Sequence, residues 1–514
     1  MFNRKPGAKK PVVRKETVLV PSEPKKTPAV TNPAARQAPT NRFQLTTNAK
    51  SASVSKPSSR TKAKTKTPVA AKRAIEQSRG LKRKSATPDR DRVVFSSDED
   101  DDGSSDAATS DSDASRKRIK SSVSSVESRG PRRSIVQESA FNTSKELESL
   151  SIIHSADATS KEYAAKFQTP WDQDYSTSVQ LQYPTHTERE RFELKWPKNY
   201  NEDYRPMEDI TQTIEMICDI YFPTELREKY SSEETGFGRR FSRAFHRQDQ
   251  EVFEEIVKDF NAVMAELVAT GKSRQELESR PVVPLKLANR ITEQIYARTV
   301  SPKVETLRKY QNGGDNVYGE LLPPFCDEIF RHVGLNHDQI FIDLGSGVGN
   351  VVLQAAIQIG CESWGIEMMK NPCDLADLQL SQLEGKAKQW GIACGNVHLL
   401  RGDFTTNSEI TTVLRKADVV LVNNQAFTPE LNDKLIAMFL DLKEGAKVVS
   451  LRPFVPEGHK ISKRNQGAVI NMFTQKMYEY FSKSVSWTEA PGKYFIAEKD
   501  SRPLEQYLKE HGLS

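Results

Sequence analysis

The stretch FIDLGSGVGN, residues 341–350, decides the fold of this chain. Its first residues, Phe341-Ile342-Asp343, predict a buried strand that runs into a glycine loop, Gly345 to Gly349. The apolar sequence VVLQAAIQIG, residues 351–360, continues as a helix. A strand, a glycine turn and a helix start together form a nucleotide-binding corner. Glycines suit such a corner because they let the backbone approach a ligand where a Cβ atom would clash.

The spacing of these glycines narrows the kind of ligand. Dinucleotide sites need the pattern G-x-G-x-x-G. Here the third glycine comes one residue early and Asn350 stands where that pattern needs glycine, which argues against a nicotinamide dehydrogenase. The order Asp343-x-Gly345-x-Gly347-x-Gly349 resembles the first motif of S-adenosylmethionine-dependent methyltransferases.

A second acid supports the corner. Residues 363–367, SWGIE, predict the next strand and place Glu367 at its carboxyl end, 24 residues after Asp343. An acid at about this distance reaches the ribose hydroxyls of a bound nucleoside. We therefore favour a cofactor site over the alternative, a tight glycine turn beside a surface glutamate.

Charge is distributed unevenly along the 514 residues. The net charge is +6, but residues 1–92 carry +19 and the rest of the chain −13. Residues 98–113 hold eight acids and no base, and residues 116–133 are basic again. Because the first 140 residues contain no Tyr or Trp, they cannot bury enough apolar area to offset the entropy of ordering. We predict a disordered arm over residues 1–160.

Short sequence signals bear on the location of the protein. LKRK (81–84) and RKRIK (116–120) look like nuclear import signals. The start of the chain lacks a secretory signal, and no apolar run approaches the ~18 residues that span a bilayer. The five cysteines form no Cys-x-x-Cys pair and the eight histidines are scattered. These features predict a nuclear protein with reduced thiols, no metal site and no membrane contact.

Beyond the arm, two kinds of periodicity appear. Residues 161–312 begin with short alternating stretches, at 177–184 and 191–197, and then become helical; Val252, Ile256, Phe260, Val263, Met264 and Leu267 fall on one predicted helix face. Residues 313–514 alternate between strands and helices. We predict strands at 339–344, 362–367, 397–402, 418–423 and 446–451, helices at 349–360, 374–390, 429–440 and 464–482, and a final strand pair over 485–500. This order implies an α/β fold with a doubly wound parallel sheet and one antiparallel edge strand, the class I methyltransferase arrangement.

Polar residues follow the third and fourth predicted strands of this sheet. Asp403 and Phe404 follow the third strand, where an acid suits the adenine amino group and an aromatic ring can stack on the base. Asn423 and Asn424 follow the fourth. Ligands bind outside the carboxyl ends of such strands. The alternatives are a helix cap at Asp403, a core role for Phe404, and a turn with Asx-type hydrogen bonds at the Asn pair.

Upstream of the glycine loop, NVYGEL (316–321) follows the pair Gly313-Gly314. This segment is predicted to fold over the cofactor as a lid. An ordinary connector into a helix starting near Pro323 is the alternative.

Seven motifs together resemble the disruptor-of-telomeric-silencing family of histone H3 lysine methyltransferases, which lack a SET domain. They are VYGELL (317–322), DLGSGVGNVVLQAA (343–356), GIE (365–367), GDF (402–404), VNNQAF (422–427), SLRPFVP (450–456) and SVSWT (484–488). Their order and spacing also match, over roughly residues 170–510. The resemblance implies a seven-stranded class I sheet, S-adenosyl-L-methionine as cofactor, a lysine in the globular core of nucleosomal histone H3 as substrate, and a role in chromatin silencing and transcription regulation.

The resemblance also implies roles for individual residues. Asn423 is implied near the methyl donor, with Tyr318, Phe427, Trp487 and Tyr494 around the lysine channel. Gln425 departs from the family, which often has an aromatic residue there. Cofactor contacts are implied at Tyr318, Gly319, Glu320, Leu321, Phe341, Ile342, Asp343, Leu344, Gly345, Ser346, Gly347, Val348, Gly349, Asn350, Glu367, Asp403 and Phe404.

Two further readings remain open for the whole chain. A nucleic-acid amino methyltransferase would share the fold, but it usually has Pro-Pro-aromatic after its Asn or Asp, and no proline follows Asn423 or Asn424. A chromatin-binding scaffold with an inactive catalytic fold is disfavoured by the intact acids Asp343, Glu367 and Asp403. The basic arm predicts contact with DNA phosphates, and the acidic block 98–113 could meet histone tails or fold back on the arm. Ubiquitylated histone is a further possible partner.

Overall fold

The computed structural model describes residues 133–513 except 145, 148, 173–174, 201–203 and 309–317. The charge blocks before residue 133, the import signals and the Gly313-Gly314 hinge lie outside the described residues. None of the helices in the described ranges is both long and apolar enough to cross a membrane.

A seven-stranded sheet in the order β10-β11-β9-β8-β5-β6-β7 forms the centre of the part of the chain after residue 317. Only β11 runs antiparallel to its neighbours, β9 and β10. This topology confirms the predicted class I methyltransferase sheet. The strands are β5 (Ile340–Leu344), β6 (Glu362–Glu367), β7 (Val397–Arg401), β8 (Val419–Val422), β9 (Lys447–Ser450), β10 (Phe473–Tyr480) and β11 (Gly492–Lys499).

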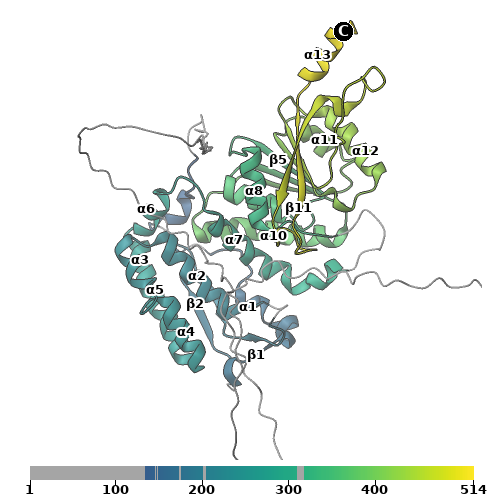
Figure 1. Ribbon diagram of the computed structural model, residues 1–514. Coiled ribbons are helices and arrows are strands. Elements are labelled where there is room, and N and C mark those ends of the chain that lie inside the picture. Colours follow the sequence, from purple (N-terminus) through teal and green to yellow (C-terminus); the bar gives the residue numbers. More distant parts are fainter. Residues whose placement is uncertain are drawn as a thin grey trace, which may run out of the picture. The chain divides into compact units, whose positions relative to one another are not determined.

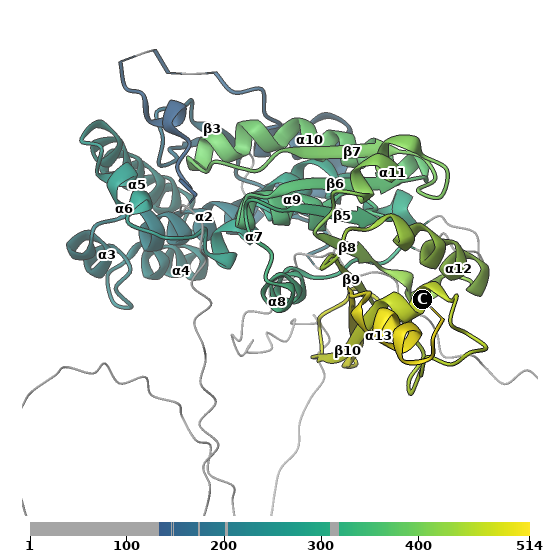
Figure 2. The same cartoon turned by 90° about the horizontal axis from the view of Figure 1, so that it is seen from above.

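Helices cover both faces of the sheet (Figures 1 and 2). In β8, Val419 and Leu421 pack in the cluster that contains α8, whereas Val420 and Val422 pack with α11 and α12. Because both faces are buried, the strand is apolar at every position. One face carries α8 (Pro323–Val333), α9 (Asn350–Gln354), a π-helical turn (Ala355–Ile359) and α10 (Lys370–Trp390); the other carries α11 (Ser408–Leu414) and α12 (Pro429–Met438).

The preceding part is mainly helical, as predicted. Its longest helix, α5, starts where the Asp249 side chain accepts a hydrogen bond from the Val252 N–H at 3.0 Å. Of the predicted face, Ile256, Phe260, Met264 and Leu267 are buried, while Val252 and Val263 are half-buried. The helices are α1 (Ser155–Ala158), α2 (Pro206–Tyr221), α3 (Thr224–Tyr230), α4 (Phe237–Arg247), α5 (Gln250–Ala269), α6 (Lys272–Glu278) and α7 (Leu285–Thr299); the short strands are β1 (Phe167–Gln168), β2 (Ser178–Leu181), β3 (Glu190–Glu193) and β4 (Trp196–Pro197).

The helical part and the sheet share one hydrophobic core. Leu383 and Trp390 of α10 belong to the same buried cluster as Phe260 of α5 and Ile291 of α7. The Tyr221 hydroxyl donates to the Trp390 carbonyl oxygen at 2.6 Å. The helical part is therefore built onto the methyltransferase sheet.

The ordered body begins earlier than the predicted arm boundary at residue 160. Val136 forms a β-bridge with Ile392, and Ile135, Val136 and Ala140 are buried. This part of the predicted arm is docked on the segment that follows α10. The sequence did not reveal it because a short segment with few apolar residues gains its stability from the surface it meets, and not from a core of its own.

The end of the chain also differs from the prediction. The helix predicted over 464–482 is wrong: Val469–Met472 form a 3-10 turn and Phe473–Tyr480 form β10. Apolar residues at 473, 477, 480 and 481 follow a helical spacing, but pairing with β11 overrides that local pattern. The strand pair predicted over 485–500 is therefore a single strand, β11, whose hairpin partner comes before it. A helix without a predicted counterpart, α13 (Arg502–Glu510), ends the described chain.

Candidate active site

A cavity of about 560 Å³ lies beside the carboxyl ends of β5, β6 and β8. It brings together most of the residues that the sequence placed there. They are Tyr318, Gly319, Glu320, Leu321, Asp343, Gly345, Ser346, Gly347, Asn350, Glu367, Asp403, Phe404, Asn423 and Phe427.

The glycine loop is held against β6 by its own backbone. The N–H groups of Gly345 and Ser346 both donate to the Ile366 carbonyl oxygen, at 2.9 and 3.0 Å. Gly345, Gly347 and Gly349 all have positive φ, at +87°, +56° and +85°. A Cβ atom on Gly347 would also lie 3.0 Å from the Tyr318 ring. The loop therefore needs glycine both for its conformation and for the close approach of Tyr318.

Two acids face the loop with different partners. The Glu367 carboxylate accepts hydrogen bonds from the N–H of Gly347 at 3.1 Å and of Met369 at 2.7 Å. Asp343 is buried, and no hydrogen bond to its side chain is found among the described residues. Burial, and secondarily the charge of Glu367, raise the pKa of Asp343 to about 7.

The third strand end supplies an acid and a ring. The Asp403 carboxylate accepts a hydrogen bond from the Thr405 N–H at 2.8 Å. Asn407, and not Asp403, caps α11 by accepting from the Ile410 N–H at 2.9 Å. The Phe404 ring lies 6.3 Å from the Phe427 ring, with an angle of 29° between their planes. Both rings line the cavity and offer it an apolar wall.

The adjacent asparagines Asn423 and Asn424 have separate roles. Asn424 is buried, accepts from the N–H groups of Leu451 and Arg452 at 3.0 and 2.8 Å, and donates to Asn432 at 2.9 Å. It ties the end of β8 to the end of β9 and does not line the cavity.

Asn423 lines the cavity, and its Nδ2 donates to the Gly319 carbonyl oxygen at 3.2 Å. Its Oδ1 is buried and has no hydrogen-bond donor among the described residues. Because a buried acceptor without a donor costs about 1–3 kcal/mol, a ligand in the cavity that donates to this oxygen would be stabilised.

The segment that starts at Tyr318 closes another side of the cavity. Glu320 is buried, and its Oε1 accepts hydrogen bonds from the hydroxyls of Tyr318 at 2.6 Å and Tyr296 at 3.2 Å. Its backbone N–H donates to the Ser486 hydroxyl at 2.9 Å, and its carbonyl oxygen accepts from the Ser486 N–H at the same distance. The segment is thus fixed to the connector between β10 and β11.

Trp487 and Tyr494 do not line this cavity. Trp487 is half-buried behind Gly319, where a Cβ atom on that glycine would lie 2.6 Å from its ring. Tyr494 is fully buried, 5.1 Å from the Phe325 ring and 5.4 Å from the Tyr478 ring, and its hydroxyl bonds His332. The register of β11 turns this side chain into the core under α8, away from the cavity, and the place of Tyr494 in a lysine channel stays a prediction.

Other predicted contact residues support the loop from behind. Phe341, Ile342 and Leu344 are core residues of β5, and Val348 packs under α7 and α10. Together with Gly349 they do not line the cavity. The sequence missed Thr306, Leu307, Val351, Ile366, Met368, Met369, Lys370, Asn371, Pro372, Thr405, Leu421, Thr428, Glu430, Leu431 and Lys434. Some of these directly follow a predicted strand end, and that position was a usable signal for Met368, Met369 and Thr405.

Across the described ranges, no group of three His, Cys, Asp or Glu side chains is placed to hold a metal ion. The site consists of a glycine loop, acids at or just after the ends of three strands, apolar aromatic rings, and one amide oxygen that has no hydrogen-bond donor among the described residues. These groups can bind a nucleoside cofactor and orient a substrate nitrogen that donates a hydrogen bond to the amide oxygen.

Comparisons with known proteins agree with this arrangement. Residues 296–498 match the family described as "Histone methylation protein DOT1". A protein of Emericella nidulans named "Histone-lysine N-methyltransferase, H3 lysine-79 specific" is 48% identical over 70% of this chain and 72% of its own length. A protein of Aspergillus fumigatus with the same name is 42% identical over 97% of this chain and 96% of its own.

A solved RNA methyltransferase from Salinibacter ruber, in complex with S-adenosyl-L-homocysteine, is 26% identical over 25% of this chain and 73% of its own. Its TM-score of 0.20 is too low to carry a conclusion. The two relatives above are 48% and 42% identical to this chain over most of their own length, and the chain therefore belongs to the DOT1 family of histone methylation proteins.

Proposed function

We propose that this chain is an S-adenosylmethionine-dependent histone-lysine N-methyltransferase whose substrate is a lysine in the globular core of nucleosomal histone H3. The names of the relatives favour the lysine at position 79 of that histone. The observation that carries the proposal is the buried Asn423 Oδ1, which faces a ligand cavity without a donor among the described residues.

The residues present fit the cofactor. The side-chain amide nitrogen of Asn350, at the start of α9, is a buried donor without a partner among the described residues, and it lines the same cavity as Asn423. Glu367 and Asp403 would hold ribose and adenine groups, and Phe404 would pack on the base. When bound, S-adenosylmethionine supplies a methyl group attached to a positively charged sulfur. Transfer of the methyl group turns this sulfur into a neutral thioether.

The chain's own residues would select a neutral amine. A free lysine has a pKa near ~10.4, so its ammonium must lose a proton before it can act as a nucleophile. Apolar walls such as Phe404 and Phe427 lower that pKa by desolvation. Asn423 Oδ1 can accept a hydrogen bond from the amine without the negative charge that would stabilise the ammonium. The proton would pass to water, and catalysis would come mainly from positioning.

The test of this proposal is methyl transfer from radiolabelled cofactor. We expect label on histone H3 in nucleosomes and none on naked DNA or RNA. Label on nucleic acid alone would identify an amino methyltransferase of nucleic acids. Cofactor binding without any transfer would identify an inactive scaffold.

We further propose that the basic arm contacts nucleosomal DNA phosphates and that the protein acts in the nucleus, in chromatin silencing and transcription regulation. Deletion of residues 1–132 removes a strongly basic segment and leaves the described body intact. We expect weaker nucleosome binding and a flatter dependence of log affinity on log salt concentration, because fewer counterions are released. Fluorescence anisotropy over a salt series measures the slope, and an unchanged slope would refute the role of the arm. A ubiquitylated histone partner is tested by repeating the series with modified nucleosomes.

The pKa of Asp343 predicts how cofactor binding depends on pH. Since burial raises this pKa to about 7, the carboxyl is largely protonated at pH 6 in the free protein. A cationic cofactor favours the carboxylate, so its affinity should rise as pH increases from about 6 to 8, by up to about tenfold. The stability of the free protein should depend on pH in the opposite direction. An acid whose pKa is raised by folding stabilises the free protein at low pH, and this stabilisation is lost as the pH approaches 7.

Calorimetry with S-adenosyl-L-methionine, which carries the positively charged sulfur, at three pH values measures the effect on binding. The variant Asp343→Asn should bind more weakly and with a flatter pH profile. Parallel profiles for the two proteins would show that Asp343 does not sense the cofactor.

A further inference from the structure

Helix α4, Phe237–Arg247, carries four arginines and no acid. Its apolar residues Phe237, Phe241 and Ala244 are buried. The residues Arg239, Arg243 and Arg247, which we call the arginine stripe, follow one another at intervals of four and are all exposed. Residues four apart lie on one face of a helix. The stripe therefore forms one solvent-facing row on a helix whose opposite face is anchored in the core.

The arginine stripe differs from Arg240 of the same helix in its ion pairing. No carboxylate of the described residues lies within ion-pair distance of the stripe; only Arg240, which points to one side, pairs with Asp259 of α5 at 2.6 Å. Arg243 donates to the Glu234 carbonyl oxygen at 3.0 Å, a contact that leaves its charge in place. Asp249, close to the end of the helix, is engaged by the Val252 N–H.

We propose that the arginine stripe binds the phosphates of duplex DNA in the nucleosome. This inference rests on the proposed nucleosomal substrate and adds a second DNA contact, on the ordered body and not on the arm. The guanidinium group matches phosphate geometry through paired N–H donors. With a rise of about 1.5 Å per residue, the stripe spans about 12 Å on a rigid helix. Such a contact fixes orientation and carries no base specificity.

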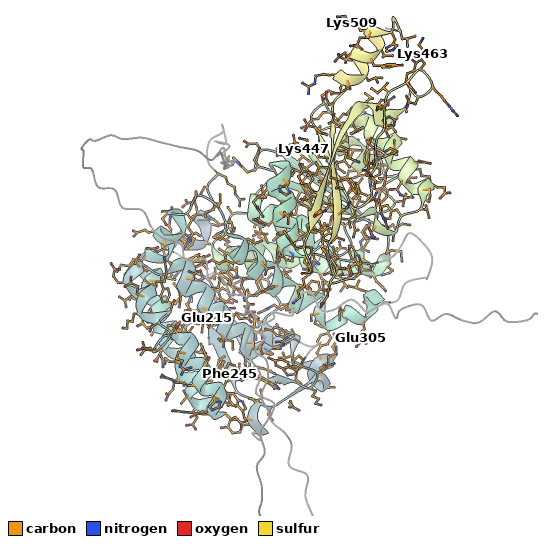
Figure 3. All side chains as sticks on the ribbon, viewed as in Figure 1. Glu215, Phe245, Glu305, Lys447, Lys463 and Lys509 are labelled. Carbon is orange, nitrogen blue, oxygen red and sulfur yellow. The ribbon has the colours of Figure 1, made fainter. Side chains whose placement is uncertain are left out.

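The composition of this face favours a DNA backbone over other anionic partners. The exposed residues between the arginines are Ser242 and His246, so the face offers no apolar anchor of the kind that protein interfaces use. The aromatic ring of the helix, Phe245 (labelled in Figure 3), packs 6.0 Å from Trp171 and 5.5 Å from Phe253. Because this ring is engaged in the subdomain, the helix lacks a stacking platform for single-stranded bases.

The test compares two full-length variants of equal charge. In the stripe variant Arg239, Arg243 and Arg247 are changed to Gln, which keeps helix propensity. In the control variant Lys272, Lys416 and Lys509 are changed to Gln; these lysines are also exposed and unpaired among the described residues. Binding to a fluorescent 30-base-pair duplex and to nucleosomes is measured by anisotropy over a salt series. Calorimetry with S-adenosyl-L-homocysteine should show unchanged cofactor binding in both variants.

We expect the stripe variant to bind duplex DNA about tenfold more weakly at ~0.1 M salt, with a slope of log affinity against log salt reduced by about two to three; the control should change by less than one. Superposed curves for the two variants would overturn the proposal. So would a loss confined to nucleosomes, which would indicate an acidic histone surface. A loss that disappears when residues 98–113 are deleted would identify that acidic block as the occupant instead. These measurements do not depend on methyl transfer, so a failure of the proposed activity would be seen separately.

Discussion

The variant Asn423→Ala should lose methyl transfer while it keeps the cofactor. Asn423 Oδ1 is the buried acceptor of the cavity that lacks a donor within the described ranges, and its Nδ2 is fixed by the Gly319 carbonyl oxygen at 3.2 Å. Removing the amide takes away the group proposed to orient the lysine nitrogen. Because a misplaced nucleophile costs on the order of 10²-fold in rate, we expect kcat on nucleosomes to fall by about that factor.

Two matched variants separate positioning from folding. Gln425→Ala removes an exposed amide two residues away and should change kcat by less than about threefold, in keeping with a surface site. Asn423→Asp keeps the shape but adds a charge that favours the lysine ammonium, so its activity should be low at pH 7 and recover partly at higher pH. If Asn423→Ala turned over at the wild-type rate, the proposed geometry of the site would have to be abandoned.

The second large effect concerns stability. Glu190 of β3 is fully buried, with Arg298 of α7 at 2.7 Å and Lys386 of α10 at 2.6 Å. The Tyr183 hydroxyl donates to the same carboxylate at 2.7 Å. Burial raises the pKa of Glu190, but Arg298 and Lys386 outweigh it and hold the pKa below its ordinary value. Burial also lowers the pKa of Lys386 to about 8, although Glu190 opposes this shift.

Changing Glu190 to Ala would leave two buried cations without this partner. Removing one member of a buried ion pair costs about 3–5 kcal/mol, so we expect the free energy of unfolding to fall by about that amount in a urea titration. The exposed neighbour Glu188 offers a control, and Glu188→Ala should cost less than about 1 kcal/mol. Equal losses of unfolding free energy in the two variants would mean that the buried ion pairs of Glu190 stabilise the fold no more than an exposed side chain does.

This network also predicts a difference at acid pH. A carboxyl whose pKa is depressed in the folded state stabilises the protein above its ordinary pKa, and the effect is lost as pH falls. The wild type should therefore lose more stability than Glu190→Gln on going from about pH 6 to pH 4. Thermal midpoints at the two pH values measure the difference, and parallel losses would contradict it.

The elements of the chain differ in how far the sequence alone could predict them. The strands β5, β6, β7, β8 and β9 lie within one or two residues of their predicted ranges. β8 gives the clearest reason, because a parallel strand buried on both faces is a continuous apolar run between polar turns. β10 was mistaken for a helix, because its sequence FTQKMYEY has both spacings and only β11 decides between them. Glu190, Arg298 and Lys386 are far apart in the chain and carry no local signal of their shared burial.

The residues of the site also differ in whether local sequence or contacts with distant residues determine their positions. The glycine loop and its acids were predictable, since positive φ angles and the distance from Asp343 to Glu367 are properties of a single β-α-β unit. Residue chemistry and spacing do not separate Asn423 from Asn424, which are adjacent and chemically identical; only the family resemblance singled out Asn423. Their roles are set by Gly319 for the first and by Leu451 and Arg452 for the second.

The sequence by itself determined the nucleotide-binding corner and the order of the parallel strands, because apolar runs and glycine spacing act over a few residues. Only the tertiary structure decided that Tyr494 is buried under α8, that the segment around Val136 docks on Ile392, and that a free amide oxygen faces the cavity. These features depend on which distant side chains meet, and such contacts form only when the whole body packs.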